Sequence, residues 1–380
     1  MNIIIGADIV PTLSNEKIFE SGNITDIVDQ NIISILDAAD YRIFNLEVPL
    51  VDIESPIQKC GPCLRASTQI VRGLKAIGVN FLTLANNHIM DQGYNGLRST
   101  MDVLDCARIA YAGAGDNIEV ASKPYIIRIS DQTVGIYCCA EHEFSIADKC
   151  KSGANPFDPL ESLDHIKDLK SQCDYVICLY HGGKEHYRYP SPLLRKTCKK
   201  IIEKGANIVI CQHTHCIGCR ENYMHGTIVY GQGNFLFDYS DNECWQTSIL
   251  INIDLRDNSV EYIPIRKNRN SVMLAQENDA QDILCKMEYR SKQIQQQGFI
   301  ESEYDKFAES MLYLYFSRDI PMMGNILFKL INKASNYRIG RYLVDRRIRK
   351  NALTYINQYN CEAHRELILC GLEKVVRDRM

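Results

Sequence analysis

Side chains that can bind a metal ion occur in five short stretches of the chain, each directly after an apolar run. Carboxylates, imidazoles and amide oxygens are ligands that divalent ions such as Zn, Mn, Fe or Mg accept. Two such ions sharing a carboxylate would activate water and stabilise the attacking and leaving oxygens of a displacement, so no protein nucleophile is needed. The residues are Asp8 in GADIV, Asn45 and Glu47 in FNLEVPL, Asn86, Asn87 and His88 in ANNHIMD, His181 in LYHGG, and His213 and His215 in CQHTH.

Each of these residues also has an ordinary structural explanation. Asp8 alone could be a turn residue, and Asn87 is of a type common in turns and helix caps. A lone His181 would more often be a partly buried, hydrogen-bonded histidine than a ligand. The spacing of His213 and His215 puts both rings on one face of a strand, or around one ion in a turn. The shared position of all five stretches after apolar runs is what favours a metal centre.

The elements that must position these residues alternate along the first two thirds of the chain. Apolar strands alternating with amphipathic helices indicate layered, mixed α/β sheets. In such sheets the carboxyl ends of strands meet along one edge, where ligands bind. Consecutive β-runs near 125–140 and 227–265 predict antiparallel additions. Strands are predicted at Ile3–Gly6, Tyr41–Leu46, Phe81–Ala85, Tyr125–Ile129, Val134–Cys139, Tyr175–Tyr180, Ile208–Cys211, Thr227–Tyr230 and Thr247–Leu255, and helices at Asn23–Ala38, Thr68–Ala76, Gly93–Ala107, Leu163–Ser171 and Leu193–Glu203.

The composition of the chain changes after about Arg266. From Asp279 onward it is richer in Gln, Lys, Arg, Glu and Tyr, with helical spacing of apolar residues. We therefore expect an α/β domain over residues 1–268 and a mainly helical extension over 269–380. The basic run Arg338–Lys350 is interpreted as a solvated helix face, with contact to an anionic polymer or a membrane surface as the alternative.

Length and composition limit the protein class. The chain has 380 residues, 46% hydrophobic content and a net charge of −4, which predicts a large core and no general nucleic-acid binding. Its 16 cysteines are scattered through apolar segments, and the opening residues have no signal-peptide pattern. No apolar run reaches the ~20 residues of a membrane helix. We expect a cytoplasmic protein, with any membrane contact peripheral.

Two cysteine pairs suggest other chemistry. The spacing of Cys60–Cys63 in CGPC is typical of redox motifs, and Cys216–Cys219 in CIGC could join it in a four-thiolate zinc site. CGPC lies in a proline-containing loop, however, so two ordinary loops are the preferred explanation. No P-loop, dinucleotide-binding glycine motif or G-x-S-x-G elbow is present.

The ordered set of motifs resembles the capsule-synthesis CapA family. The resemblance rests on NLEVPL, LANNHIMDQG, YAGAG, HGGKEHYRYPSP, CQHTHCIG and YGQGNFLFDY, and it covers about residues 1–265. That family is associated with poly-γ-glutamate and capsule biosynthesis and has metallophosphoesterase-like folds. The resemblance therefore implies a layered α/β/β/α domain that binds divalent metal ions, expected to be two.

Position by position, the resemblance also implies roles. His88 would be the general acid, and its i+3 spacing suggests that Asp91 orients it. The chain departs from the family pattern at three places. It has Ala7 where a glycine is usual before the first acidic ligand, and HGG where His-Trp-Gly is usual. At the last pair of histidines it has QHTH where Gly-His-His-Pro-His is usual. The implied metal ligands are Asp8, Glu47, Asn87, His181, His213 and His215, and the implied substrate-binding residues are Asn45, Glu185, Tyr187 and Asn234.

These inferences predict a divalent-metal-dependent hydrolase of capsule, poly-γ-glutamate or other surface-polymer biosynthesis, using metal-activated water. The family favours an amide bond as the target, and the fold favours a phosphoester. The alternative is a non-catalytic assembly or export component that binds an anionic polymer and keeps a structural metal site. Expected partners are the anionic polymer or its precursor and membrane-bound capsule-assembly proteins, without nucleic acid.

Overall fold

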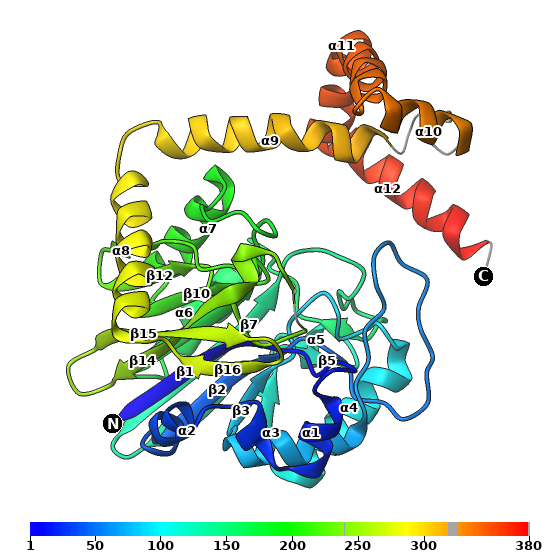
Figure 1. Cartoon of the computed structure of the whole chain (residues 1–380). Helices are drawn as coiled ribbons and strands as arrows, with labels where there is room; N and C mark the ends of the chain where they lie inside the picture. Colours follow the sequence, from blue (N-terminus) through cyan, green and yellow to red (C-terminus); the bar gives the residue numbers. More distant parts are fainter. Residues whose placement is uncertain (239, 318–325, 379–380) are drawn as a thin grey trace. The chain divides into compact units, whose positions relative to one another are not determined.

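A computed structural model describes residues 1–238, 240–317 and 326–378. The chain divides into two compact units, Met1–Glu301 and Ser302–Met380 (Figure 1). The first unit contains two large β-sheets and the helices that cover them, and it carries every site residue predicted from the sequence.

The first sheet has parallel strands in one half and antiparallel strands in the other. Its order is β16-β15-β14-β1-β2-β3-β4, and β13 also pairs with β1. The four strands from β1 to β4 run parallel, whereas β14, β15 and β16 pair antiparallel. The bounds are β1 Asn2–Ile9, β2 Tyr41–Leu46, β3 Phe81–Thr83, β4 Ala110–Ala112, β13 Asn234–Leu236, β14 Thr247–Asp254, β15 Ser259–Asn268 and β16 Ser271–Leu274.

The second sheet has the order β11-β12-β10-β9-β7-β6. Strands β7, β9, β10 and β12 are parallel, and the hairpin partners β6 and β11 are antiparallel at the two edges. These hairpins and the β14–β15 pair confirm the predicted antiparallel additions. The bounds are β6 Tyr125–Ile129, β7 Gln132–Ala140, β9 Tyr175–His181, β10 Ile208–Gln212, β11 Arg220–Tyr223 and β12 Gly226–Tyr230; a small separate pair is β5 Ala114–Gly115 with β8 Gly153–Ala154.

Alternating side chains along the strands produce the layers. In β1, Ile3 and Ile5 lie in the apolar cluster between the two sheets, whereas Ile4 packs toward helices α1–α4. In β9, Ile177 faces the first sheet, and Val176 packs toward α6 and α7. This alternation confirms the α/β/β/α architecture. The covering helices are α1 Glu16–Ser21, α2 Gln30–Asp37, α3 Val71–Ile77, α4 Gly93–Ala107, α6 Ser162–Lys170 and α7 Pro192–Glu203, and α5 Ile118–Ala121 lies against β5.

The predicted helix Asn23–Ala38 is wrong in its first half. The segment holds a single 3₁₀ turn at Ile24–Asp26, and α2 begins only at Gln30. Val28 forms a β-bridge to Val272 of β16, which keeps the chain extended there. The Asp29 side chain then accepts a hydrogen bond from the Asn31 backbone N–H and caps the helix.

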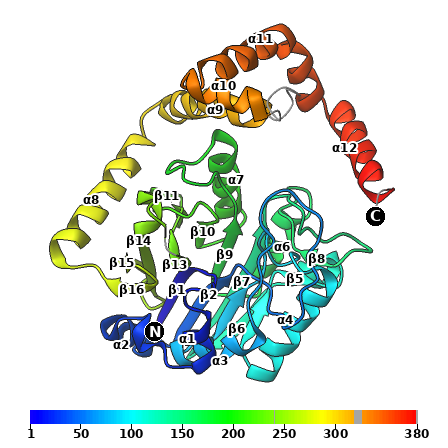
Figure 2. The ribbon, with the colours of Figure 1, turned by 45° about the vertical axis from the view of Figure 1, so that its right-hand side comes forward.

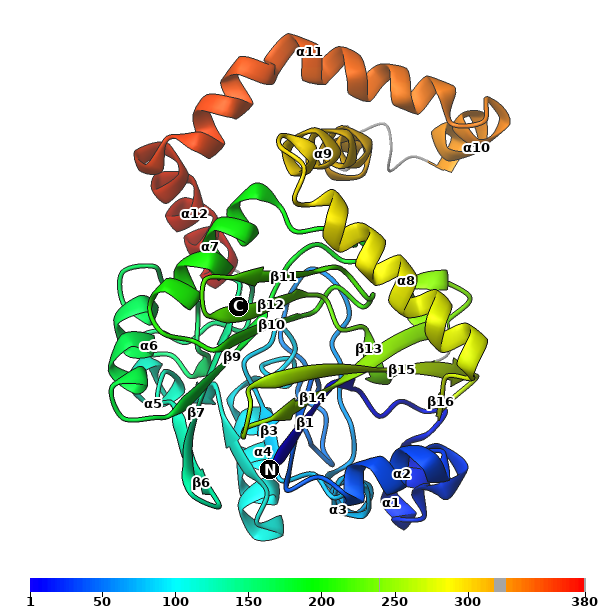
Figure 3. The same ribbon diagram turned by 90° about the vertical axis from the view of Figure 1, so that its left-hand side faces the viewer.

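The boundary between the two units lies later than residue 268. Helix α8 (Glu277–Gln293) is polar enough to change the composition of the chain, yet Ile283 and Met287 are buried in the cluster between the sheets. Figure 3 shows α8 beside β15 and β11, which it contacts. The change in composition therefore marks a surface helix of the first unit and not a domain boundary.

The second unit is helical, as the sequence predicts. Its helices are α9 Phe299–Ser317, which begins in the first unit, α10 Ile326–Ala334, α11 Arg338–Asn360 and α12 Glu362–Arg377. Helix α10 packs against α11 (Figure 2). Within the described ranges, no helix has the length and apolar character needed to cross a bilayer.

None of the described cysteines forms a disulfide bond. Cys60 and Cys63 lie at the surface of their loop, while Cys216 and Cys219 are buried. Among the described residues the two pairs do not meet in a group that could hold a metal ion. The preferred explanation, two ordinary loops, fits this arrangement.

Candidate metal centre

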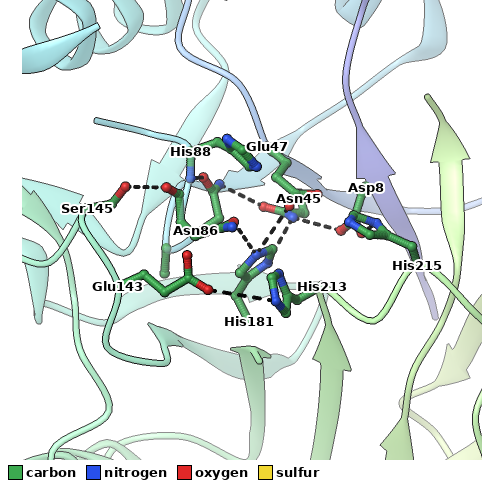
Figure 4. Close-up of polar contacts among 12 residues, drawn as sticks. Asp8, Asn45, Glu47, Asn86, His88, Glu143, Ser145, His181, His213 and His215 are labelled. Atoms are coloured by element: carbon green, nitrogen blue, oxygen red, sulfur yellow. Dashed lines mark hydrogen bonds and ion pairs between the residues drawn. The ribbon is translucent and has the colours of Figure 1, made fainter. Parts of the chain in front are cut away.

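The five polar stretches converge at the carboxyl ends of strands from both sheets (Figure 4). Asp8 lies in β1 opposite Asn45 in β2, and Glu47 follows β2 directly. His181 ends β9, where it pairs with Gln212 of β10. The remaining members follow β3 and β10: Asn86, Asn87, His88, Asp91, His213 and His215.

One potential ion site is formed by Glu47, His181 and His213, all of which are buried. One ligand atom from each lies within 4.8 Å of the others. His181 Nε2 is 3.4 Å from Glu47 Oε1 and 3.0 Å from Asn87 Oδ1. The Asn87 amide oxygen therefore faces the same point and can act as a fourth ligand.

A second potential site is formed by Asp8, Glu47 and His215, again within 4.8 Å. His215 Nδ1 lies 3.6 Å from Asp8 Oδ2. Glu47 belongs to both groups, so its carboxylate can bridge two ions. The geometry thus contains the shared carboxylate on which the sequence-based hypothesis depends.

Buried acceptors without hydrogen bonds indicate that this donor set suits cations. Both carboxylate oxygens of Glu47 and Oδ2 of Asp8 are buried and accept no hydrogen bond. His213 Nδ1 is also buried without a hydrogen-bond partner. Buried carboxylates are costly unless paired or coordinated, and nearly all buried polar atoms find partners. Oxygen and imidazole ligands of this kind fit Mn, Zn, Fe or Mg.

The pKa shifts describe how these charges compensate one another. Burial and the neighbouring Glu47 raise the pKa of Asp8. Burial alone would raise the pKa of Glu47 too, but the His181 and His215 imidazoles lower it below its ordinary value. Burial lowers the pKa of His213 well below its usual range, so this ring is neutral and able to coordinate.

His215 carries the compensating proton in the metal-free protein. Although burial opposes it, the carboxylates of Glu47 and Asp8 raise its pKa to about 9. An ion must displace this proton, so binding releases a proton and the apparent affinity increases as the pH rises toward about 9. Trp245, the single tryptophan, has its ring 5.2 Å from that of His215 and should report binding by its fluorescence. We expect Mn²⁺ titrations to show weaker binding at each lower pH, and an affinity independent of pH below about 9 would contradict this account.

The turn after β10, which carries the two candidate metal ligands, is strained. His213 has φ 85° and His215 has φ 53°, in the left-handed region that residues with a Cβ rarely adopt. Gly231 packs behind the turn, and a Cβ there would lie 2.7 Å from the Cys216 carbonyl oxygen. Strain of this kind persists where the surroundings impose it, as they do at many functional sites.

His88 is held by a carboxylate and a lysine. Its Nδ1 lies 2.6 Å from Asp91 Oδ2, which also accepts a hydrogen bond from the Leu64 N–H. Lys59 Nζ pairs with Asp91 Oδ1 and lies 3.3 Å from His88 Nδ1. Because Nδ1 faces Asp91, Nε2 is the ring nitrogen that remains for proton transfer. Figure 4 shows His88 beside Glu47.

Lys59 was missed by sequence reasoning. It belongs to the loop between β2 and α3, and no periodic pattern marks it. Its side chain is 3% exposed, and that of Asp91 is fully buried. The loop is fixed by further contacts with the turn that carries Asp91, among them the Ser55 N–H to Gln92 Oε1 hydrogen bond of 2.7 Å. The only feature in the sequence that could have indicated its role is that Lys59 directly precedes CGPC.

Two expected substrate contacts, Asn45 and Asn234, form hydrogen bonds with candidate metal ligands. Asn45 is fully buried, donates to Asp8 Oδ1 at 2.7 Å and accepts from the Asn86 amide at 3.1 Å. Asn234 is also buried, and its Oδ1 lies 2.8 Å from His215 Nδ1. Both side chains thus contact candidate metal ligands, and Asn45 has no exposed surface.

The other two expected substrate contacts are not brought into the ligand groups. Glu185 is exposed, beside His186. Tyr187 is buried, and its ring packs edge-on against Tyr189 at 5.9 Å.

An aromatic group that the sequence did not suggest lies beside His215. The Trp245 Nε1–H donates to His186 Nε2 at 2.7 Å, and the Phe237 and Trp245 rings are 4.6 Å apart. Phe237 also lies 5.4 Å from the His215 ring. These rings form one wall next to the second ion site.

Comparisons with known proteins agree with the motif pattern. The family model described as "Bacterial capsule synthesis protein PGA_cap" matches residues 3–239. "Capsule biosynthesis protein CapA" of Bacillus anthracis is 29% identical over 250 residues, which are 63% of this chain and 61% of that protein. "PGA biosynthesis protein CapA" of Bacillus subtilis (strain 168) is 29% identical over 231 residues, 59% of this chain and 60% of that protein. The chain thus spans about three fifths of the length of these relatives.

Among solved structures, a phosphatase from Mycoplasma pneumoniae is 13% identical. The match covers 71% of this chain and 94% of that chain, with a TM-score of 0.45. A likeness this distant carries no weight for function, so the site is interpreted from its own residues.

Proposed function

The chain belongs to the bacterial capsule synthesis family, and from this premise we propose that it is a divalent-metal-dependent hydrolase of capsule or poly-γ-glutamate biosynthesis. The observation that carries the proposal is Glu47, a buried carboxylate without hydrogen bonds that is shared by two ligand groups. A site that only stabilised the fold would need one closed ion site and no proton donor beside it.

Bound ions would supply a water molecule of lowered pKa and positive charge for the developing oxyanion. The residues of the chain would do the rest. Asn87 is held in place because Ser145 Oγ donates to its backbone carbonyl at 2.5 Å, so its side-chain oxygen stays directed at the first group. His88 would give the leaving group a proton from Nε2, while Asp91 keeps Nδ1 occupied.

The proposed bond is a phosphoester or an amide. The names of the relatives, which refer to capsule and to PGA biosynthesis, favour the amides of a glutamate polymer. The Asn87–His88 arrangement beside two potential ion sites suits either displacement, because both develop negative charge on oxygen.

The test is turnover of two substrates with defined metals. Bis(p-nitrophenyl) phosphate and poly-γ-glutamate would each be offered to protein loaded with Mn or with Zn, and to protein treated with EDTA. We expect metal-dependent turnover of at least one. Bound metal without turnover of either substrate would overturn the hydrolase proposal and favour a binding component of polymer assembly.

Lys59 provides a prediction for a residue outside the ligand set. Replacing it by methionine leaves Asp91 buried without its cation, which should lower the free energy of unfolding by about 3–5 kcal/mol. We also expect kcat to fall by ~10-fold with KM unchanged, since Lys59 is too buried to reach a substrate. Urea unfolding and steady-state kinetics measure the two effects.

A double variant tests whether the loss of stability comes from the unpaired charge of Asp91. Lys59→Met with Asp91→Asn removes both buried charges, so stability should recover to within about 1 kcal/mol of the wild type. Turnover should stay low, because Asp91→Asn also removes the carboxylate partner of His88. Full recovery of both properties would show that neither Lys59 nor Asp91 assists His88 in turnover. Lys149→Met, at an exposed position, is the matched control.

A further inference from the structure

Residues 326–350 of the helical unit concentrate positive charge. They contain eight Lys and Arg side chains against one Asp, a net charge of +7 in a chain whose net charge is −4. The single acid, Asp345, pairs with Arg349 at 2.8 Å. The other seven cations therefore have no acidic neighbour within this stretch.

Helix α10 presents two different faces. Its buried side carries Phe328 and Asn332, and Asn332 Oδ1 accepts a hydrogen bond from the Gly340 N–H at the start of α11. Its outer side exposes Ile326 (77%), Leu330 (61%) and Ile331 (46%). Leu330 lies one turn after Ile326, and Ile331 is the next residue round the helix, so the three exposed side chains form one broad apolar stripe.

Lysines border this apolar stripe. Lys329 and Lys333 lie one turn apart on α10 and are both exposed. On α11, Arg338, Arg341 and Arg346 continue the exposed positive charge. An exposed apolar stripe bordered by Lys and Arg is the pattern of helices that lie in a membrane interface.

We propose that α10 and the first half of α11 form a docking surface for an anionic phospholipid bilayer. The apolar stripe of Ile326, Leu330 and Ile331 enters the boundary between headgroups and acyl chains, and the basic residues bind the acidic headgroups. The proposal is independent of the proposed hydrolase activity, since none of these residues belongs to the metal centre.

The charge and the apolar stripe together favour an acidic membrane over a second copy of the chain or a soluble anionic polymer. A second copy of the chain would bring one +7 surface against another, which opposes a symmetric dimer through this face. A soluble anionic polymer would satisfy the cations but would leave the stripe of Ile326, Leu330 and Ile331 in water. An acidic membrane surface satisfies both.

The test is sedimentation of the full chain with lipid vesicles. Vesicles of phosphatidylcholine alone would be compared with vesicles that also contain phosphatidylglycerol, at low and high salt. We expect binding only with phosphatidylglycerol. The charge variant Lys329→Glu/Lys333→Glu/Arg341→Glu should lower partitioning by at least about 100-fold, from about fivefold per charge. The apolar variant Ile326→Ser/Leu330→Ser/Ile331→Ser should lower it by at least about tenfold.

Controls make each outcome decisive. Lys17→Glu/Lys149→Glu/Lys196→Glu reverses three exposed charges in the first unit and should bind vesicles like the wild type. Circular dichroism should show equal helix content in all variants. Loss of binding in the charge variant together with full binding in the apolar variant would overturn insertion of the stripe. Failure to bind any vesicle, with retention on immobilised poly-γ-glutamate, would assign the surface to the polymer instead.

Discussion

Replacing His88 by glutamine is expected to lower turnover by about 100-fold or more, while the protein keeps its full complement of metal ions. Glutamine has a similar length and can still contact Asp91, but it cannot supply a proton at the position of Nε2. Since His88 belongs to neither ligand group, the ions should remain. Steady-state kinetics with a substrate that has a poor leaving group measures the loss of turnover. Elemental analysis of the same sample measures the metal content.

The choice of substrate sharpens this experiment. A general acid matters most when the leaving group is a poor one, so the loss should shrink with p-nitrophenolate, which needs little protonation. His165 lies on α6 and belongs to neither ligand group, so His165→Gln is the matched control and should keep wild-type turnover. An equal loss with good and poor leaving groups would show that His88 serves binding or structure and not proton donation.

Replacing Glu47 by glutamine has a still larger expected effect. Glutamine keeps the shape of the side chain but removes the negative charge that both ligand groups share. Changes to residues that merely orient a ligand typically cost 10–100-fold in metal affinity or activity, so loss of the shared ligand should exceed ~1,000-fold in turnover. Turnover measured at saturating Mn²⁺ would test whether excess metal can compensate.

Two variants, each of which alters only one of the two ligand groups, serve as comparisons for Glu47→Gln. Asp8→Asn affects only the group with His215, and His213→Asn affects only the group with His181. Each should retain one ion and lose less turnover than Glu47→Gln. If Asp8→Asn were as damaging to metal binding as Glu47→Gln, the two groups would have to act as a single ion site.

Much of the fold was predictable because single elements carry local signals. Strands Tyr41–Leu46 and Tyr125–Ile129 and helix Gly93–Ala107 were predicted with their observed bounds. Helix α7 begins where Ser191 caps it and Pro192 occupies its first turn, a combination readable from the sequence. The prediction of an element is wrong where a contact distant in sequence determines the local structure, as the pairing of Val28 with Val272 shows.

The convergence of the candidate metal ligands was predictable for a different reason. A strand end fixes which edge of a sheet a residue occupies, so Asp8, Glu47 and His181 could be placed together without tertiary contacts. Lys59 could not, because its contact with Asp91 spans 32 residues and depends on the path of a long loop. The burial of Asn45 and its hydrogen bond to Asp8 are likewise invisible in the sequence.

The central claim is that Glu47 joins two ion sites, and metal stoichiometry tests it most directly. Elemental analysis after Mn²⁺ loading and gel filtration would be run on the wild type, Asp8→Asn, His213→Asn and Glu47→Gln. The two ligand groups predict two ions in the wild type, one in each of the first two variants and none tightly held in Glu47→Gln. One ion in the wild type, or two retained by Glu47→Gln, would contradict the shared-carboxylate centre.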